Sequence, residues 1–121
     1  MQISTKEEIY EIRDYTIESK WFDRYVDWAE NYFIPFAKTR IDIIDFWVDK
    51  GIDAEVSGEN PIESENGQPN ITWIARYNDK KERDAFFQSL GTDSEWKKVW
   101  SMHPNPNAYI QQNTRFFKSV I

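Results

Sequence analysis

The chain has 121 residues, of which 15 are Lys or Arg and 21 are Asp or Glu, giving a formal net charge of −6. This length predicts one domain, residues 1–121, and the acidic, interspersed charge disfavours nucleic-acid phosphates and anionic membranes as partners. The absence of cysteine excludes disulfides, thiol catalysis and thiolate metal sites. We expect a cytoplasmic protein, because the sequence contains neither a signal-peptide pattern nor an apolar run of membrane-spanning length.

The first half of the chain predicts a strand, a helix and a second strand. Apolar and polar residues alternate over residues 8–17, as in a strand, and an aromatic stripe with helical spacing follows. In this helix Ser19 is the expected N-cap, and Pro35 should end or kink it near Phe33. A second alternating segment precedes a polar stretch, residues 52–69, which is longer than most connections and is read as a mobile loop, a lid or an interface arm.

The second half of the chain completes the predicted fold. A third strand ends before Asp79, an expected N-cap that is followed three residues later by Glu82, as in a capping box. A second short helix carries Trp96 and Trp100 at core spacing, and residues 108–120 form the last strand. The order β-α-β-β-α-(α)-β predicts an α+β, ferredoxin-like domain with helices on one face of an antiparallel four-stranded sheet.

The sheet face that the helices leave uncovered is the expected functional surface. The alternation places large rings and isolated polar groups on it, a mixture that is unusual for a solvated face. We therefore expect a homodimer with C₂ symmetry in which two sheets enclose a cavity. The candidate residues for this face are Arg13, Tyr15, Asp45, Trp47, Arg76, Asn113 and Arg115. In the third strand Trp73 and Arg76 have opposite parity, so only one of them can face the opening.

Three segments, "EIYEIRDYTI", "IIDFWVD" and "ITWIARYNDKKERDAFFQSLGTDSEWKKVW", together resemble the NIPSNAP family of dimeric α+β barrel proteins. The resemblance spans roughly residues 8 to 120 and departs from the family in the 52–69 loop and in "HPNPN". The matching residues are "EIRDYT" at 11–16, the Phe46–Trp47 pair, Trp73, Arg76, Tyr77, Asp79, Glu82, Arg83 and Trp96. The biochemical activity of the family is poorly defined, so the resemblance implies a fold and a dimer, and no particular reaction.

The preferred functional hypothesis is a homodimeric barrel whose cavity binds a small aromatic or carboxylate-bearing molecule. Arg13 would hold the anionic group, because an arginine keeps its charge and offers a fork of donors. Tyr15 and Trp47 would shape the pocket, and Arg76 or Arg115 would add charge. We expect no metal, no cofactor, no nucleic acid and no membrane partner.

Each of these assignments has a structural alternative. Arg13 would equally form an ion pair with Glu11 on the same strand or with Asp45 on a neighbouring one. Tyr15, Trp47 and Trp73 would equally be core or dimer-packing residues. A solvated ion pair explains Arg83.

His103 carries the enzymatic alternative, because it is the only histidine and has an ordinary pKa near neutrality. Related dimeric α+β barrels include cofactor-free monooxygenases, haem-degrading enzymes and isomerases. In a monooxygenase or isomerase of this type, His103 would be the acid or base, close to the cavity. A surface or capping role is the alternative for a lone loop histidine. A third hypothesis is a non-catalytic interaction module whose dimer presents the 52–69 loop to a partner.

Overall fold

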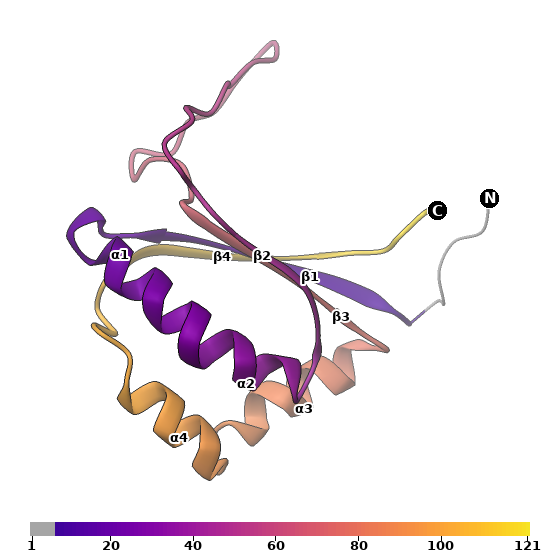
Figure 1. Cartoon of the computed structure of the whole chain (residues 1–121). Coiled ribbons are helices and arrows are strands. Elements are labelled where there is room, and N and C mark those ends of the chain that lie inside the picture. Colours follow the sequence, from indigo (N-terminus) through magenta and orange to yellow (C-terminus); the bar gives the residue numbers. More distant parts are fainter. Residues whose placement is uncertain (1–6) are drawn as a thin grey trace.

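The computed structural model describes residues 7–121, so the first six residues of the predicted domain lie outside the described part. The element order confirms the predicted α+β, ferredoxin-like fold (Figure 1). The elements are β1 (Ile9–Ile17), α1 (Ser19–Trp28), the π-helical stretch η1 (Ala29–Phe33), α2 (Ile34–Lys38), β2 (Asp42–Val48), β3 (Ile71–Tyr77), α3 (Lys80–Ser89), α4 (Ser94–Ser101) and β4 (Tyr109–Phe117).

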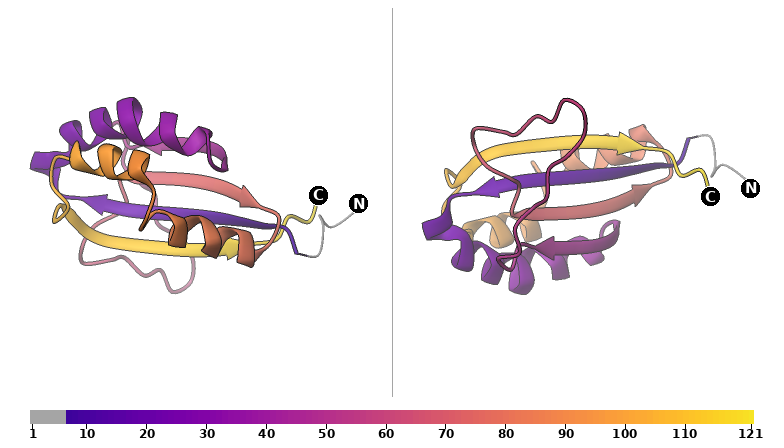
Figure 2. Two further views of the ribbon diagram at one scale, coloured as in Figure 1. Left: turned by 90° about the horizontal axis from the view of Figure 1, so that it is seen from below. Right: turned by 90° about the horizontal axis from the view of Figure 1, so that it is seen from above.

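The four strands form one antiparallel sheet in the order β2-β3-β1-β4, so β2 and β4 are its edges. All the helices lie on one side of this sheet, and the other side is the open face (Figures 1 and 2). The register fixes which residues share a side, because directly paired residues of antiparallel strands point the same way. Arg13 pairs with Trp73 and Thr114, whereas Ile12 pairs with Ile74 and Arg115. These two sets therefore occupy opposite faces.

The first helical segment is longer and less regular than predicted. It runs to Lys38, passes through η1, and places Pro35 in the first turn of α2, where a missing N–H is tolerated. The wider π-helical turn immediately before the proline is the predicted irregularity near Phe33. Ser19 is not the N-cap, because the helix begins at Ser19 itself and Glu18 precedes it without a capping side-chain hydrogen bond.

The later helices begin at aspartate caps. The Asp79 carboxylate accepts a hydrogen bond from the Glu82 backbone N–H at 2.7 Å, which confirms the predicted N-cap of α3. Asp93 does the same for α4, where it accepts from the backbone of Glu95 and Trp96. Of the two predicted core residues of α4, Trp96 packs against the core, whereas Trp100 is 38% exposed and stacks on Trp96 with 5.7 Å between the ring centroids.

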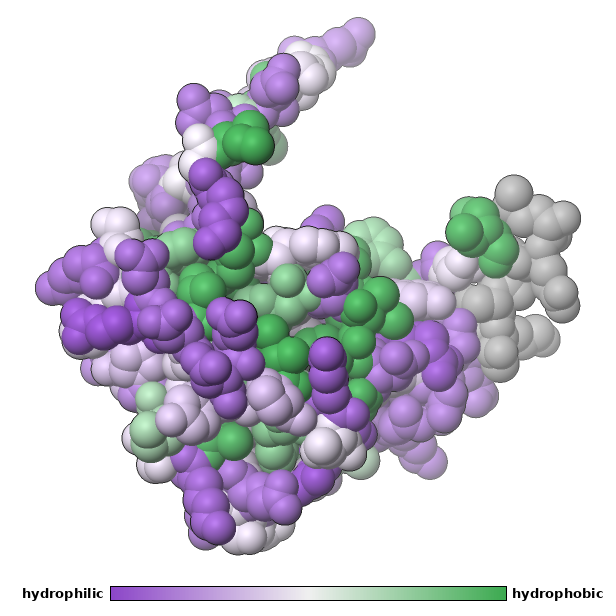
Figure 3. Space-filling model, viewed as in Figure 1, coloured by the Kyte–Doolittle hydropathy of each residue, from purple (hydrophilic) through white to green (hydrophobic). Residues whose placement is uncertain are grey.

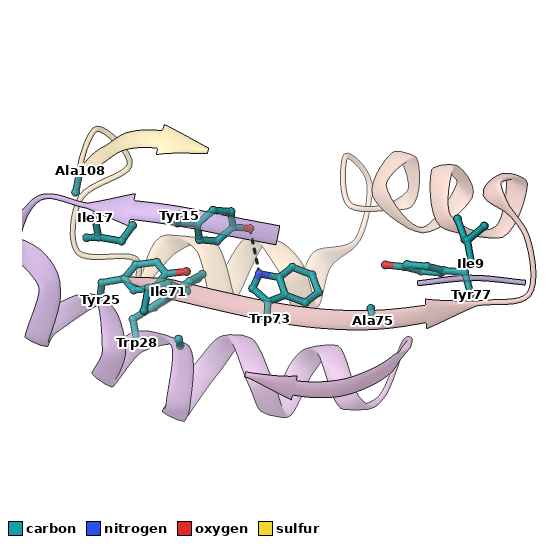
Figure 4. Packing of buried hydrophobic residues seen from close by; sticks show 11 residues of the cluster. Ile9, Tyr15, Ile17, Tyr25, Trp28, Ile71, Trp73, Ala75, Tyr77 and Ala108 are labelled. Carbon is teal, nitrogen blue, oxygen red and sulfur yellow. Dashed lines mark hydrogen bonds between the residues drawn. The ribbon is translucent and has the colours of Figure 1, made fainter. Parts of the chain in front are cut away.

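The buried core lies between the sheet and the helices (Figure 4). Tyr15, Trp73 and the α1 residues Tyr25 and Trp28 pack together toward one end of the sheet, and Tyr77 packs near Ile9 at the other. No helix within residues 7–121 is long and apolar enough to cross a membrane.

The segment between β2 and β3 leaves the sheet on the side opposite the helices and crosses in front of the open face (Figures 1 and 2). Asn70 fastens its end to β1 with three hydrogen bonds, all 2.9 Å long. Its side chain accepts from the backbone N–H of Ile17 and donates to the Ile17 carbonyl, and its backbone N–H donates to the Tyr15 carbonyl. Asp49 N–H donates to the Asn70 carbonyl, which closes the base of the segment.

Candidate functional site

A pocket of about 220 Å³ lies between the sheet and the helices. Side chains from three strands, α1, η1, α3, α4 and the residue that follows α3 form its walls, and nearly all of them are aromatic. They are Arg13, Tyr15, Tyr25, Trp28, Phe33, Trp73, Phe86, Phe87, Leu90, Trp96 and Tyr109. This volume is below the roughly 300–1,000 Å³ of pockets for drug-sized ligands, so it suits a molecule with a single ring.

Arg13 and Tyr15 form the polar part of this pocket. Arg13 Nε donates a hydrogen bond to the Tyr15 hydroxyl oxygen at 2.8 Å, and Trp73 Nε1 donates to the same oxygen at 3.2 Å (Figure 4 draws the second). Because that oxygen already accepts two hydrogen bonds, the Tyr15 hydrogen is available for donation to a molecule in the pocket. The Arg13 guanidinium also lies 4.9 Å from the centre of the Phe87 ring, and its side chain keeps 15% of its exposure.

A buried ion cluster supports the site from beside Arg13. Glu11 is fully buried, and its Oε2 lies 3.3 Å from Arg13 Nη1 and 2.6 Å from Arg83 Nη2. Arg83 Nε also donates to this oxygen, at 2.8 Å. One buried carboxylate thus serves two guanidinium groups, and among residues 7–121 Asp84, half exposed at 3.1 Å from Arg83, adds a second negative charge. Of these four charged residues Arg13 lines the pocket.

Both arginines remain charged. Burial acts to lower the pKa of Arg13, but Tyr15 and Glu11 outweigh it and hold that pKa above its ordinary value. Burial likewise opposes the charge of Arg83, whose pKa is nevertheless raised by Glu11 and Asp84.

The expected orientation of the first strand was wrong. Glu11, Arg13 and Tyr15 face the helices and not the uncovered side of the sheet, because Arg83 and Phe87 of α3 provide the partners that Glu11 and Arg13 need. The predicted ion pair between Arg13 and Glu11 is confirmed. The alternative pair with Asp45 is wrong, since the pairing of Asp45 with Ile74 puts it on the open face.

Trp47, Arg76 and Arg115 lie on the open face, as predicted, so the structure divides the predicted binding residues between two faces. Trp73 faces the helices, which settles the parity of the third strand. Both open-face arginines are already paired. Arg76 contacts Glu8 and Asp42 at 2.6 and 2.9 Å, and Arg115 contacts Asp14 at 3.2 Å.

His103 is buried behind the pocket and does not line it. Its Nδ1 accepts a hydrogen bond from the Asn105 backbone N–H at 3.1 Å, so the ring hydrogen belongs on Nε2, which lies 2.8 Å from the Tyr109 hydroxyl. Burial lowers the pKa of His103 to about 4 and raises the pKa values of Tyr25 and Tyr109. All three groups are therefore neutral near pH 7, and the surface role considered for His103 is wrong.

Comparison with known proteins identifies the fold. No family model and no curated protein matches the chain. A solved NIPSNAP-like domain protein from Burkholderia xenovorans superposes with a TM-score of 0.68 at 13% identity, over 93% of this chain and 85% of that one. A NIPSNAP family protein of unknown function from Agrobacterium tumefaciens gives 0.67 at 16% identity, over 98% and 94%. The chain has the NIPSNAP fold.

A more distant structure extends the comparison to enzymes. A putative antibiotic biosynthesis monooxygenase from Bacteroides thetaiotaomicron superposes on this NIPSNAP-like chain with a TM-score of 0.57 at 7% identity, over 96% of this chain and 92% of that one.

The helical walls of the pocket in this NIPSNAP fold were not anticipated as site residues. Phe33, Phe87 and Trp96 were read from the sequence as core positions or left unassigned, although they line the pocket together with Arg13. A signal was present in the composition, because twenty Phe, Tyr and Trp residues are more than a small core can bury.

The pKa of His103 predicts a stability change at moderately acidic pH. This pKa is about 4 in the folded chain against 6.5 ordinarily, so the unfolded chain takes up a proton first as the pH falls. This contribution to the free energy of unfolding is complete above pH 6.5. It is lost between about pH 6.5 and 4, where we expect the free energy of unfolding to fall by about 3 kcal/mol.

Urea unfolding of the wild type and of a His103→Gln variant, at intervals from pH 7 to 4, measures this change. His103 is the only histidine, so the difference in slope between the two proteins isolates its titration. Equal slopes in that pH window would contradict the prediction.

Proposed function

We propose that this NIPSNAP-like protein binds a small aromatic carboxylate in the pocket between its sheet and its helices. One observation carries the proposal: Arg13 and Tyr15, which both keep a free donor, line a pocket whose other walls are almost entirely aromatic rings. Among residues 7–121 no group accepts a hydrogen bond from Arg13 Nη2, and none accepts the Tyr15 hydroxyl hydrogen. A carboxylate beside these two groups would receive two hydrogen bonds, one of them charge-assisted.

The walls define the rest of the ligand. Phe33, Phe87 and Trp96 offer ring faces and edges to a flat apolar body, for which edge-to-face and offset packing are favourable. Arg13 lines the pocket, whereas its carboxylate partner Glu11 does not, so an anion entering the pocket meets the Arg13 guanidinium directly. A neutral ligand of the same shape would lose this attraction.

Benzoate and its neutral counterpart benzamide test the proposal. We expect benzoate to bind the wild type more tightly than benzamide, and Arg13→Met to weaken benzoate binding about 10- to 100-fold, the value of one charge-assisted hydrogen bond in a desolvated site. Isothermal titration calorimetry measures both affinities.

Arg24→Met is the matched control for this experiment. Arg24 lies on the exposed side of α1, where its guanidinium stacks 4.0 Å from the Trp21 ring centre, and it does not line the pocket. It should leave benzoate binding unchanged. Equal binding of benzoate by both arginine variants, each shown to be folded by circular dichroism, would refute the proposed site.

The proposal includes a homodimer formed through the open face of the sheet. Trp47 and Phe117 keep 46% and 45% of their exposure there, and Ile12 and Ile74 lie between them on the same side. Such an apolar patch on a sheet face favours packing against a second sheet. Sedimentation velocity over a range of protein concentrations tests for the dimer.

A catalytic role is the second candidate function. The Tyr15 hydroxyl favours it, because its oxygen accepts hydrogen bonds from both Arg13 and Trp73. With Arg13 holding the carboxylate, this hydroxyl would donate a hydrogen bond to the enolate oxygen that develops while a solvent base removes the benzylic proton, as an isomerase requires. Phenylpyruvate is a suitable probe, because enolisation exchanges its benzylic hydrogens with deuterium in D₂O. We expect exchange above the buffer rate that Tyr15→Phe abolishes, measured by proton NMR. No acceleration by the wild type would leave the protein a binding module.

A further inference from the structure

The segment that links β2 to β3 contains an exposed stretch with the pattern of a strand. We call residues 52–69 the acidic arm. Ile52, Ala54 and Val56 alternate with Asp53 and Glu55, yet none of them belongs to a strand. An alternating segment of this kind presents backbone donors and acceptors that a sheet edge would satisfy.

The arm differs from the rest of the chain in charge. It contains five acidic residues and no Lys or Arg, whereas the other residues carry 16 acidic and 15 basic side chains. Almost all of the net charge of −6 therefore belongs to the arm. Its apolar residues are also exposed, with Ile52 at 88% and Ile62 at 91%. Figure 3 shows the arm as a projection that is mostly hydrophilic, with isolated hydrophobic patches. These features suit a contact that combines apolar burial with a basic surface.

The edge strand β4 has the matching properties. It is nine residues long, mostly exposed, and within residues 7–121 it pairs only with β1, so its outer side is open. A long open edge is a template for a strand from another chain. Residues 109–121 contain no Asp or Glu and include Lys118 and Arg115, and Arg115 keeps 49% of its side-chain exposure while it contacts Asp14 at 3.2 Å. The other edge, β2, carries Asp42, which contacts Arg76 at 2.9 Å, and Asp45, which would repel an acidic segment.

We propose that residues 52–56 of the acidic arm add a strand to the outer edge of β4 in a second copy of this chain. The direction of the arm favours a second copy over the same chain, because the arm projects from the open face away from its own helices (Figure 1). Side chains of Ser64 and Asn66 bind Gln111 of β4 at 3.3 and 2.9 Å, which holds the base of the arm over its own sheet. The inference rests on the proposed homodimer, in which the partner sheet lies on the side of the open face toward which the arm projects.

Single cysteines test the contact directly, because the chain contains none of its own. An Ala54→Cys variant is mixed with an isotopically labelled Asn113→Cys variant and treated with a short bismaleimide, which tolerates an unknown strand register. The control mixture pairs Ala54→Cys with Lys97→Cys on the exposed helix α4. We expect at least fivefold more mixed cross-link, identified by mass, in the first mixture than in the control.

Charge reversal provides a second measurement of the same contact. Arg115→Glu with Lys118→Glu in the Asn113→Cys chain should reduce the cross-link several-fold, and Asp53→Lys with Glu55→Lys in the Ala54→Cys chain should restore it. Failure of the second change to restore the cross-link would refute the charge pairing.

The outcomes separate this inference from the proposed homodimer. A wild type that sediments as a dimer but gives no excess cross-link would overturn the arm contact alone. A cross-link confined to a single chain, seen when both cysteines are placed in one diluted variant, would show that the arm docks on its own sheet and would also overturn it. A wild type that is monomeric at every concentration would overturn both.

Discussion

Glu11→Gln is expected to destabilise the protein by about 3–5 kcal/mol, the usual effect of removing one partner from a buried ion cluster. The change is isosteric and removes the negative charge that Arg13 and Arg83 share at 3.3 and 2.6 Å. Two guanidinium groups then remain partly buried with only the half-exposed Asp84 beside them. This loss is a large fraction of the roughly 5–15 kcal/mol that stabilises a typical domain. Urea unfolding at pH 7 measures it.

Glu30→Gln is the matched control, because Glu30 is exposed and belongs to none of the ion pairs within residues 7–121. It should change the free energy of unfolding by less than about 0.5 kcal/mol. A Glu11→Gln variant as stable as Glu30→Gln would show that the cluster does not hold α3 against β1.

Trp73→Ala is expected to destabilise the protein by about 3–5 kcal/mol, since it leaves a cavity where a large buried ring was. Trp73 is only 2% exposed, lies 5.3 Å from the Phe33 ring centre, and donates the hydrogen bond to Tyr15. The new space would join the existing pocket, because Trp73 is one of its walls. Thermal and urea unfolding measure the loss.

Indole gives this prediction a specific signature. An apolar cavity of suitable shape binds the group that was removed, so millimolar indole should raise the melting temperature of Trp73→Ala more than that of the wild type. Trp73→Phe keeps most of the ring and should lose only about 1 kcal/mol. An equal effect of indole on both proteins would contradict the cavity.

The order of the elements could be predicted from the sequence because it depends on local patterns. The alternation of β1 and β3, and the Asp79 cap with Glu82 three residues later, specify strands and a helix start without reference to the rest of the chain. The resulting β-α-β-β-α-α-β order leaves few ways to arrange the sheet.

The sequence patterns did not predict which face of β1 the helices cover. Alternation shows that Glu11 and Arg13 share a face, but not that helices cover that face. The decisive partner, Arg83, is 72 positions from Glu11, and pairing with it makes a charged face the buried one. Ile12 lies on the open face instead and adds an apolar side chain to the surface through which we propose the homodimer.

The walls of the pocket depend on an irregularity that residue types do not specify in advance. Trp28 immediately precedes the π-helical stretch and Phe33 is its last residue, and both reach the pocket because that stretch alters the spacing of the aromatic stripe. In a regular α-helix with 3.6 residues per turn, the side chains of Trp28 and Phe33 would point in different directions.

Asn70 lies at the junction between the acidic arm and the sheet that carries the pocket. The acidic arm ends directly before Asn70, and Tyr15, to which Asn70 is hydrogen-bonded, lines the pocket. The arm and the pocket therefore meet at the same three hydrogen bonds. Because these hydrogen bonds hold the end of the arm, the arm can change its position without moving β1. We therefore expect a change in the position of the arm to leave the Tyr15 hydroxyl in place, so that the proposed assembly and the proposed ligand binding would operate independently.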